Sequence, residues 1–362
     1  MNYLKNIDNF DNIALVLYQK DDLRLEQWPL EDSLKSNECL LQAHSCGICG
    51  TDLTLWKKGF VADFVVKNPY VLGHEPSAVV IAVGNDVTHL KPGDRVAVEP
   101  AIPCLECEFC RSGRYNLCPI SNQQSHGLPP ADGCLRRYYV HRADFCYKLP
   151  ENVSLEEGAI VEALAVVVHA CRRVNVGIGH NVVVCGAGPV GIMSALCAKA
   201  FGANKVLITD IDKSRLDLAK ELGIDEVIHI DINNFNDKQV AQTIKEQMSS
   251  DALGADVTIE CTGVESSVCL AIYATKSGGK VGIVGLGGNP RIPLSCAAMR
   301  EVDLIGVCRI KDDYQLAIKL ISSGKLNVKP LITHKFRIEE AIDAFNLLKS
   351  GQQGVLKVLI QY

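Results

Sequence analysis

The pattern of hydrophobic and polar residues changes near residue 154, so the two parts of the chain are expected to differ in secondary structure. In the first part, short apolar runs rich in β-branched residues are separated by turn signals at residues 84–85 and 91–94. Such spacing is typical of short strands in a β barrel or sandwich. The strands expected here are Ala14–Tyr18, Glu38–Ala43, Ala78–Val83 and Arg95–Glu99.

The second part alternates between strand and helix patterns. It opens with Ser154 and Glu157, whose capping-box spacing precedes the apolar run Ala159–Ala170 and places Glu162 on a helix. Strands are then expected at residues 181–185, 205–209, 226–230, 256–261, 280–284 and 304–307, with helices at 190–201, 214–222, 236–249 and 265–275. This alternation predicts a parallel sheet covered on both faces. Helices near 314–322 and 338–349 and a strand at 355–360 follow.

Length sets the number of domains. At roughly 150 residues per domain, 362 residues predict two to three domains. Because no Pro-rich or Ser-rich linker occurs, the boundary is expected in or beside a helix near Ala165. We therefore expect a β-rich domain at residues 1–165, a parallel-sheet domain at 166–306, and a return of residues 307–362 to the first domain.

The apolar run Val182–Ala198 approaches the length of a membrane-spanning helix. Three glycines and Pro189 interrupt it after a β-branched start, and breakers of this kind favour a buried strand, a tight turn and a helix. Asp8, Asp11, Asp21 and Asp22 likewise interrupt the region where a secretory signal would be apolar. The expectation is a protein that neither spans nor binds a membrane.

Composition narrows the functional classes. Hydrophobic residues make up 48% of the chain and charged residues 22%, values typical of a globular enzyme. The net charge is −5 and no run of basic residues occurs, so the sequence does not indicate binding of nucleic acid. Sixteen cysteines are unusual, but disulfide-stapled secreted scaffolds are normally much shorter. Reduced thiols in the cytoplasm, some of them binding metal, are the better expectation.

A dinucleotide site is indicated by Gly186-Ala187-Gly188-Pro189-Val190-Gly191, which follows an expected strand and opens an expected helix. In G-x-G-x-x-G, the first glycine makes the turn, the second admits the pyrophosphate and the third allows close packing. Asp210 ends the next strand, where a carboxylate binds the ribose hydroxyls and repels a 2′-phosphate, so NAD is favoured over NADP. Arg215 is a potential partner for a 2′-phosphate, and a simple turn cap is the alternative role of Asp210.

Two groups of residues have the chemistry of metal ligands. Cys104, Cys107, Cys110 and Cys118 form C-x₂-C-x₂-C-x₇-C, which suits a closed tetrahedral structural zinc; an iron–sulfur site and free thiols are the alternatives. The second group is Cys49, the pair His74-Glu75, and Glu162. Catalytic zinc keeps three protein ligands and one open position, at which a bound oxygen becomes acidic.

These motifs together resemble the zinc-dependent medium-chain dehydrogenases and, within them, the sorbitol (polyol) dehydrogenase family. The similarity covers nearly the whole chain. The matching stretches are Gly47–Asp52, 63–67, Gly73–Glu75, 93–97, 113–117, 169–173, 260–265 and 327–331. The resemblance implies a two-domain α/β fold, with a GroES-like β-rich catalytic domain and a Rossmann NAD-binding domain with a doubly wound parallel sheet, usually assembled as a homotetramer.

By the same resemblance, Cys49, His74 and Glu75 ligate the catalytic zinc, and Glu162 holds a zinc-bound water or the substrate. Thr51 stands where the family has the serine of a proton relay, and Arg309 would bind substrate oxygens. Two zinc ions per chain are implied, one structural and one catalytic. The residues implied to line the NAD groove are Gly186, Gly188, Val190, Gly191, Asp210, Arg215, Val284, Gly285, Leu286, Val307, Cys308 and Arg309.

The implied activity is reversible oxidation of a secondary alcohol of a polyol such as sorbitol or xylitol, with hydride transfer to NAD. Several positions depart from the family. Leu55 and Ile310 replace tyrosines that contact substrate, the segment 122–128 is longer and lacks an aromatic residue, and Pro76, Ala78 and Ala163 are further changes. Each lost hydroxyl removes a hydrogen bond worth about 1 kcal/mol net. A different alcohol substrate, or a catalytically weak paralogue with a binding or regulatory role, are the alternatives.

Overall fold

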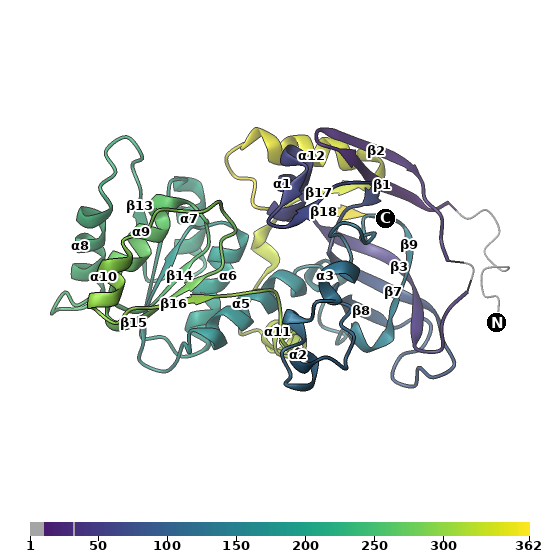
Figure 1. Ribbon diagram of the computed structural model, residues 1–362, viewed down its shortest axis with the longest axis horizontal. Coiled ribbons are helices and arrows are strands. Elements are labelled where there is room, and N and C mark those ends of the chain that lie inside the picture. The colour runs from purple at the N-terminus through teal and green to yellow at the C-terminus, as the bar shows by residue number, and fades with distance from the viewer. Residues whose placement is uncertain (1–10, 32) are drawn as a thin grey trace. The chain divides into compact units, whose positions relative to one another are not determined.

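The computed structural model describes residues 11–31 and 33–362, which form two compact units (Figure 1). The first unit holds the described residues up to Ala163 together with Tyr314–Tyr362, and the second is Leu164–Asp313. The second unit therefore extends beyond the expected end at residue 306. Two contacts retain this extension, because the Val307 N–H donates to the Ile283 carbonyl oxygen and Asp313 is buried beside His169.

The larger sheet of the first unit has the strand order β10-β8-β7-β3-β18-β17, and β9 also pairs with β3. Only the pair β17 and β18 is parallel, as expected for a barrel-like sheet built from hairpins. The strands are β3 (Glu38–Gly47), β7 (Glu75–Val83), β8 (Arg95–Val98), β9 (Tyr138–Arg142), β10 (Cys146–Lys148), β17 (Ile332–Arg337) and β18 (Lys357–Gln361).

Smaller sheets and short helices complete the first unit. β1 (Ile13–Gln19) lies between β2 (Asp22–Gln27) and β6 (Tyr70–Val71), and β4 (Phe60–Val61) pairs with β5 (Phe64–Val65). The helices are α1 (Gly50–Lys58), α2 (Glu108–Arg111), α3 (Ser121–Gln124), α4 (Leu155–Gly158), α11 (Tyr314–Ser322) and α12 (Ala341–Ser350), while α5 (Val161–Arg173) crosses from the first unit into the second.

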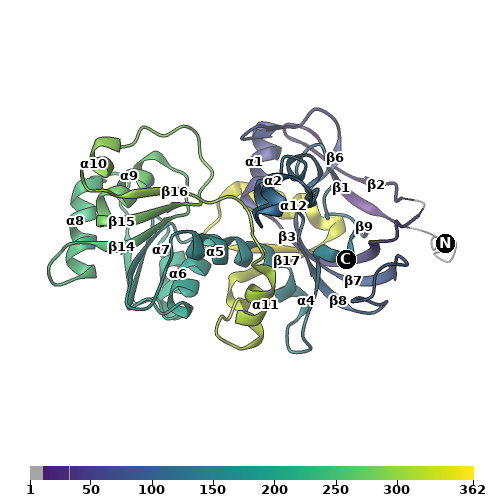
Figure 2. The ribbon, with the colours of Figure 1, turned by 60° about the horizontal axis from the view of Figure 1, so that its bottom comes forward.

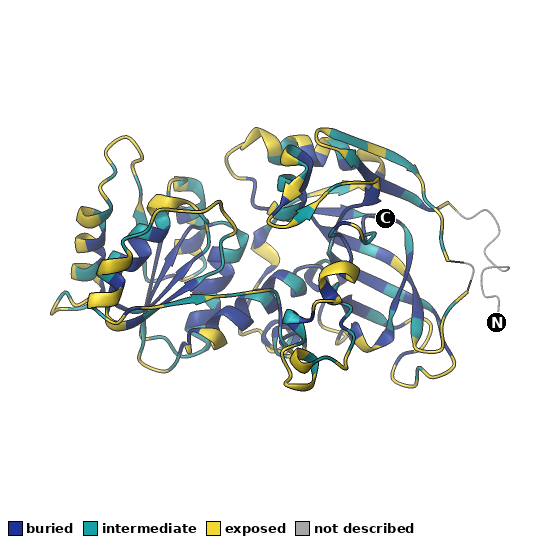
Figure 3. Cartoon of the chain, in the orientation of Figure 1, coloured by how far each residue is buried: buried dark blue, intermediate teal, exposed yellow. Residues whose placement is uncertain are grey.

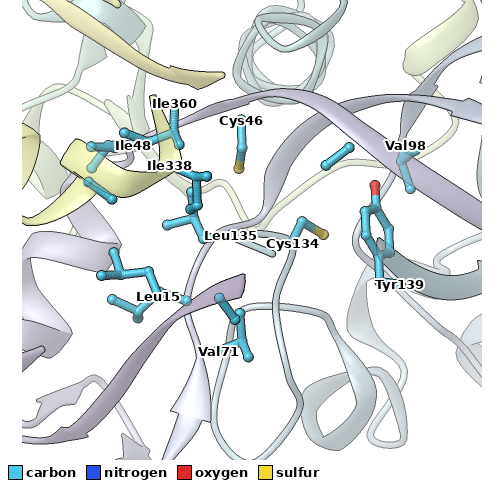
Figure 4. Packing of buried hydrophobic residues seen from close by; sticks show 14 of the residues in the cluster. Leu15, Cys46, Ile48, Val71, Val98, Cys134, Leu135, Tyr139, Ile338 and Ile360 are labelled. Carbon is cyan, nitrogen blue, oxygen red and sulfur yellow. The ribbon is translucent and has the colours of Figure 1, made fainter. Parts of the chain in front are cut away.

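The core of the first unit is built by residues that are far apart in the sequence. Leu15, Val71, Leu135 and Ile360 belong to one cluster of buried side chains (Figure 4). Burying one such aliphatic side chain contributes on the order of 2 kcal/mol. In Figure 3 the strands of both units are mostly buried, whereas the connecting turns are exposed. The strands therefore form a rigid base for the loops and helix ends that carry the candidate site.

The second unit has one parallel sheet with the strand order β13-β12-β11-β14-β15-β16. This is the order of the dinucleotide-binding Rossmann fold. Helices α6 and α7 cover one face of the sheet, and α8, α9 and α10 cover the other (Figure 2). The elements are β11 (Asn181–Cys185), α6 (Pro189–Ala200), β12 (Lys205–Asp210), α7 (Lys213–Glu221), β13 (Glu226–His229), α8 (Asp237–Met248), β14 (Ala255–Glu260), α9 (Glu265–Ala274), β15 (Thr275–Ile283), α10 (Leu294–Met299) and β16 (Asp303–Gly306).

The fold class predicted from the sequence is confirmed, with one local correction. Ser154 and Glu157 do form a capping box, but it starts the separate short helix α4, and α5 begins only at Val161. Glu162 is therefore in the first turn of α5. The run Val182–Ala198 divides into β11, a glycine turn and α6. Within the described ranges, no helix combines the length and apolarity that crossing a membrane requires.

Candidate active site

The candidate catalytic metal site lies in the first unit. Cys49 is the N-cap residue of α1, and His74 and Glu75 stand at the start of β7. The ligand atoms of these three side chains all lie within 4.8 Å of one another. A thiolate, an imidazole and a carboxylate at this separation are a suitable donor set for zinc with one position left open. The residues present therefore fit the metal that the sequence motifs imply.

Asp52 contacts both ends of this donor set. Its Oδ2 accepts a hydrogen bond from the Cys49 N–H at 2.9 Å, and its Oδ1 lies 3.3 Å from Nδ1 of His74. With Nδ1 facing Asp52, the Nε2 atom of His74 is left for a metal ion. Burial lowers the pKa of His74, but the charges of Asp52 and Cys49 outweigh burial and hold this pKa well above its usual range. The same anionic surroundings favour a bound cation.

Glu75 is held from the other side by a buried lysine. Nζ of Lys357 lies 2.8 Å from Oε1 and 2.6 Å from Oε2 of Glu75. Burial lowers the pKa of Lys357, but the charges of Glu75 and Cys49 raise it by more than burial lowers it. The pKa therefore lies above its ordinary value. Lys357 is therefore a permanent positive charge beside the candidate ligands.

Two further candidate residues lie in the first unit with the metal ligands. Burial and the charge of Glu75 raise the pKa of Glu162 to about 7, although the charges of His74 and Lys357 oppose this shift. Glu162 can therefore exchange a proton near neutral pH. Thr51 is partly exposed in the first turn of α1, immediately after Gly50. Leu55, by contrast, is fully buried and packs in the core cluster of the first unit.

The four cysteines of the second candidate metal site converge on one point. The Sγ–Sγ distances are 3.5 Å for Cys107–Cys110, 3.6 Å for Cys104–Cys118 and 3.9 Å for Cys104–Cys110. A tetrahedron with zinc–sulfur bonds of 2.3 Å has edges of about 3.8 Å, so the thiols fit a single zinc ion. Sulfurs this close leave no room for a cluster of several irons.

Backbone N–H groups also point at these sulfurs. The Cys104 N–H donates to the Cys118 sulfur at 3.4 Å, and the Cys107 N–H donates to the Cys104 sulfur at 3.3 Å. Burial raises the pKa of Cys118, but hydrogen bonds from Cys104 and from the backbone of Ser121 and Ile120 lower it to about 6. A thiol with this pKa is largely ionised at neutral pH and is ready to bind a cation.

The glycine motif of the second unit has the geometry expected for a dinucleotide. Gly186 has a φ of +100°, and a Cβ on Gly191 would lie 1.8 Å from the Gly186 carbonyl oxygen. The space above Gly188 is open, with no atom within 4 Å of the position of a Cβ. Gly188 is also the N-cap residue of α6, so backbone N–H groups and the helix dipole favour a phosphate there. The residues fit a nicotinamide dinucleotide.

Asp210 connects this turn to the next one. Its Oδ2 accepts a hydrogen bond from the Ala187 N–H, and its Oδ1 accepts one from the Asp212 N–H at 2.8 Å. The carboxylate thus caps the following turn and also stands beside the glycine turn. A role as a turn cap is therefore compatible with a role in binding the ribose. Arg215 is partly exposed on α7 and lies 3.6 Å from Asp212.

A second pair of loops lies at the same edge of the sheet, because the strands are parallel and their carboxyl ends coincide. The N–H groups of Val284 and Gly285 both donate to the Glu260 carbonyl oxygen at 2.9 Å. The buried Glu260 carboxylate accepts hydrogen bonds from Thr262, Gly263 and Ser267. Glu260 therefore sets the shape of the loops that carry Val284–Leu286.

Residues 307–310 continue from β16 at this edge. Cys308 is exposed, and Arg309 has a φ of +54°. Left-handed backbone at a non-glycine residue costs on the order of 1 kcal/mol and is often retained at functional sites. Ile310 is buried, with 3% of its surface exposed.

Three residues in contact with the candidate site were not assigned roles from the sequence: Asp52, Glu260 and Lys357. The signal for Lys357 was one charge within the apolar stretch Val355–Ile360. The signal for Asp52 was an acid three residues after the N-cap Cys49, where it closes a capping box. Glu260 opens the matching stretch 260–265, but a polar residue at a strand end is common and indicates no particular role.

Family models match both halves of the chain. The alcohol dehydrogenase GroES-like domain matches residues 35–151, and the zinc-binding dehydrogenase domain matches residues 189–323. Among solved structures, an oxidoreductase/dehydrogenase of unknown specificity from Escherichia coli superimposes with a TM-score of 0.88 at 32% identity, covering 97% of this chain and 99% of that one. A zinc-binding dehydrogenase from Sinorhizobium meliloti bound to NADP gives 0.85 at 26% identity, with 97% and 99% covered. Fold and site thus define a zinc-binding, nicotinamide-dependent dehydrogenase.

The curated relatives are more specific. Sorbitol dehydrogenase of Bos taurus is 49% identical over 352 residues, which are 97% of this chain and 96% of the relative. The human enzyme of the same name is 48% identical over 342 residues, covering 94% of both chains. The chain belongs to the sorbitol dehydrogenase family, and the resemblance read from its motifs is confirmed.

Proposed function

We propose that the chain catalyses the reversible oxidation of a secondary alcohol of a polyol, of the sorbitol or xylitol type, to the ketose with NAD. The observation that carries this proposal is the convergence of the Cys49, His74 and Glu75 donor atoms within 4.8 Å. It occurs in a chain that is 49% identical to a sorbitol dehydrogenase along almost its whole length.

The residues divide the chemistry among them. When bound, zinc supplies a Lewis acid for the alcohol oxygen, and the nicotinamide supplies a hydride acceptor. Cys49, His74 and Glu75 would hold the metal ion and leave its fourth position open. Thr51 would take the proton of the substrate hydroxyl and pass it to solvent. Glu162, whose pKa is about 7, would hold a water or a substrate hydroxyl beside the metal.

Arg309 would bind substrate oxygens, and Asp210 would bind the ribose hydroxyls of the cofactor. The position of Asp210 beside the glycine turn supports NAD over NADP, since a second negative charge there is unfavourable. The four-cysteine site supports a count of two zinc ions per chain, one structural and one catalytic. Sixteen cysteines support a reducing, cytoplasmic location.

A homotetramer is part of the proposal. Its support is the exposed apolar surface of residues 286–299, which precede the edge strand β16. Leu286, Leu294 and Met299 expose 73%, 63% and 87% of their surfaces. Exposed apolar residues gathered in one segment mark association surfaces. Light scattering after size-exclusion chromatography tests the subunit number.

The test of function is NADH formation by the purified protein with sorbitol, xylitol, simple secondary alcohols and amino-hydroxy acids, each with NAD and with NADP. We expect the specificity constant to be highest for a polyol with NAD. The Cys49→Ser variant should have no activity. If only another class of alcohol is oxidised rapidly, the assignment as a dehydrogenase stands but the substrate class changes. Leu55 and Ile310, which stand where the family has tyrosines, would account for such a change. No turnover by zinc-loaded protein that binds NADH would favour the binding or regulatory paralogue.

A further inference from the structure

Lys357 is a buried lysine on β18, the strand next to the edge strand β17 of the larger sheet. It is the first residue of β18, exposes only 3% of its surface and lies between apolar neighbours in the sequence. An unpaired buried ammonium is strongly unfavourable, so its environment must supply acceptors. Such a residue is retained only where its charge has a defined position.

All three hydrogen-bond donors of this ammonium have an acceptor. Nζ lies 2.8 Å and 2.6 Å from the two carboxylate oxygens of Glu75, and 3.4 Å from the carbonyl oxygen of Ile48. Glu75 is itself buried, with 1% of its surface exposed. The lysine therefore contacts a candidate metal ligand directly and also contacts the backbone next to Cys49.

The sheet explains how the two side chains meet. Strand β3 lies between β18 and β7, and Gly47 of β3 is paired with Leu359 on one side and with Glu75 on the other. A Cβ on Gly47 would lie 2.1 Å from Oε2 of Glu75. The bare glycine thus leaves the space that the Glu75 carboxylate occupies while it contacts Lys357.

We propose that Lys357 is a positioning residue in the sense that it acts through Glu75, whose carboxylate charge it offsets at the candidate metal site. The proposal rests on the proposed function, because it assigns a role toward the metal that Cys49, His74 and Glu75 would hold. A divalent cation together with one thiolate and one carboxylate ligand forms a group with no net charge. The ammonium of Lys357 returns one positive charge to this group and thereby preserves the electrophilic character that alcohol oxidation needs.

A purely structural ion pair makes a different prediction. If Lys357 only stabilises the fold, then removing it loosens Glu75 and weakens metal binding. If it offsets charge at the metal, then removing it makes the donor set more negative and strengthens metal binding while turnover falls. Metal affinity in the absence of substrate therefore separates the two roles without reference to activity.

The experiment measures zinc affinity by chelator competition for wild type, Lys357→Met and Lys357→Arg, with Cys49→Ser identifying the zinc ion that belongs to this site. In Lys357→Met we expect zinc to bind about tenfold more tightly and kcat to fall about tenfold with a smaller change in KM. Lys357→Arg, which keeps the charge, should remain within about threefold of wild type in both. The matched control is Lys349→Met, which removes an exposed lysine paired with Asp21 and should change neither value.

Unchanged or weaker zinc binding in Lys357→Met would overturn the proposal. If Lys357→Met does not fold, the visible spectrum of the cobalt-substituted Lys357→Arg protein is measured instead. Because this variant keeps the positive charge, its spectrum should match that of the cobalt-substituted wild type. An altered spectrum overturns the proposal. Failure of the proposed function has a different signature, namely wild-type protein that binds zinc at Cys49, His74 and Glu75 but oxidises no polyol. The affinity comparison remains valid in that case.

Discussion

Oδ1 of Asp52 lies 3.3 Å from Nδ1 of His74, while Oδ2 of the same carboxylate accepts a hydrogen bond from the Cys49 N–H. One fully buried acid thus contacts two candidate metal ligands that are 25 residues apart in the sequence. Carboxylates in contact with a ligating histidine fix its tautomer and ring orientation. The position of His74 therefore depends on a residue that is not itself one of the candidate ligands.

Replacing Asp52 by asparagine should weaken zinc binding at this site by about 10- to 100-fold. The amide is neutral and cannot accept with both terminal atoms, so either the His74 contact or the Cys49 hydrogen bond is lost. Chelator competition on purified protein measures the change. Asp86→Asn, at an exposed position on the same unit, is the matched control. Equal zinc affinity in D52N and D86N would show that Asp52 has no influence on the ligands.

Asp210→Ala should reduce the preference for NAD over NADP by at least about tenfold. Loss of the carboxylate would remove the proposed charge-assisted hydrogen bonds to the ribose and the repulsion of a 2′-phosphate, for which Arg215 is the candidate partner. Specificity constants for the two cofactors give the ratio. Asp217→Ala, on the exposed face of α7, should leave the ratio unchanged. If the ratio of the specificity constants for NAD and NADP is unaltered in D210A, Asp210 serves only as a turn cap.

Cys107→Ser should lower the zinc content from two ions per chain to one. The ion that remains is the one at Cys49, because the two candidate sites share no residue. We also expect the melting temperature to fall by at least about 5 °C, since loop residues 104–118 would lose the metal ion that is proposed to order them. Cys269→Ser, which removes a cysteine outside both sites, serves as the control. Two zinc ions in C107S would exclude this structural site.

Much of this organisation could be predicted from the sequence, because its determinants are local. The glycine turn, the strand before it and the helix after it lie within about 20 consecutive residues, and each glycine has a steric reason. The four cysteines are equally local. Spacing alone therefore predicted both groups, and the structure brings the residues of each group together.

The remaining features depend on contacts between distant segments. Lys357 meets Glu75 across β3, 282 residues apart in the sequence, and no local pattern reveals the pairing of these strands. The start of α5 at Val161 was also not predicted, because the capping box and the apolar run read as one helix. Tertiary packing decides such boundaries.

The last prediction concerns His141 on β9, which exposes only 1% of its surface. Nε2 of this residue lies 2.9 Å from the Glu99 carbonyl oxygen, and its ring is 4.6 Å from that of His126. Burial lowers the pKa of His141 to about 4, and the charge of Arg142 lowers it too, although the contact with Glu99 and the charge of Glu38 oppose the shift. The pKa of His126 is also lowered by burial.

In the unfolded chain a histidine titrates near pH 6.5, so between pH 6.5 and about 4 the unfolded state takes up a proton that folded His141 does not. Its contribution to stability is therefore complete above pH 6.5 and is lost progressively as the pH falls toward 4, by about 3 kcal/mol in total. His141→Gln keeps a donor for the Glu99 carbonyl oxygen but cannot titrate. The free energy of unfolding in urea, measured at pH 7.5 and pH 5, should therefore depend less on pH in H141Q, by up to about 1.4 kcal/mol per pH unit. His229→Gln, at an exposed position, is the control, and equal pH dependence in H141Q and wild type would mean that His141 takes up its proton while folded.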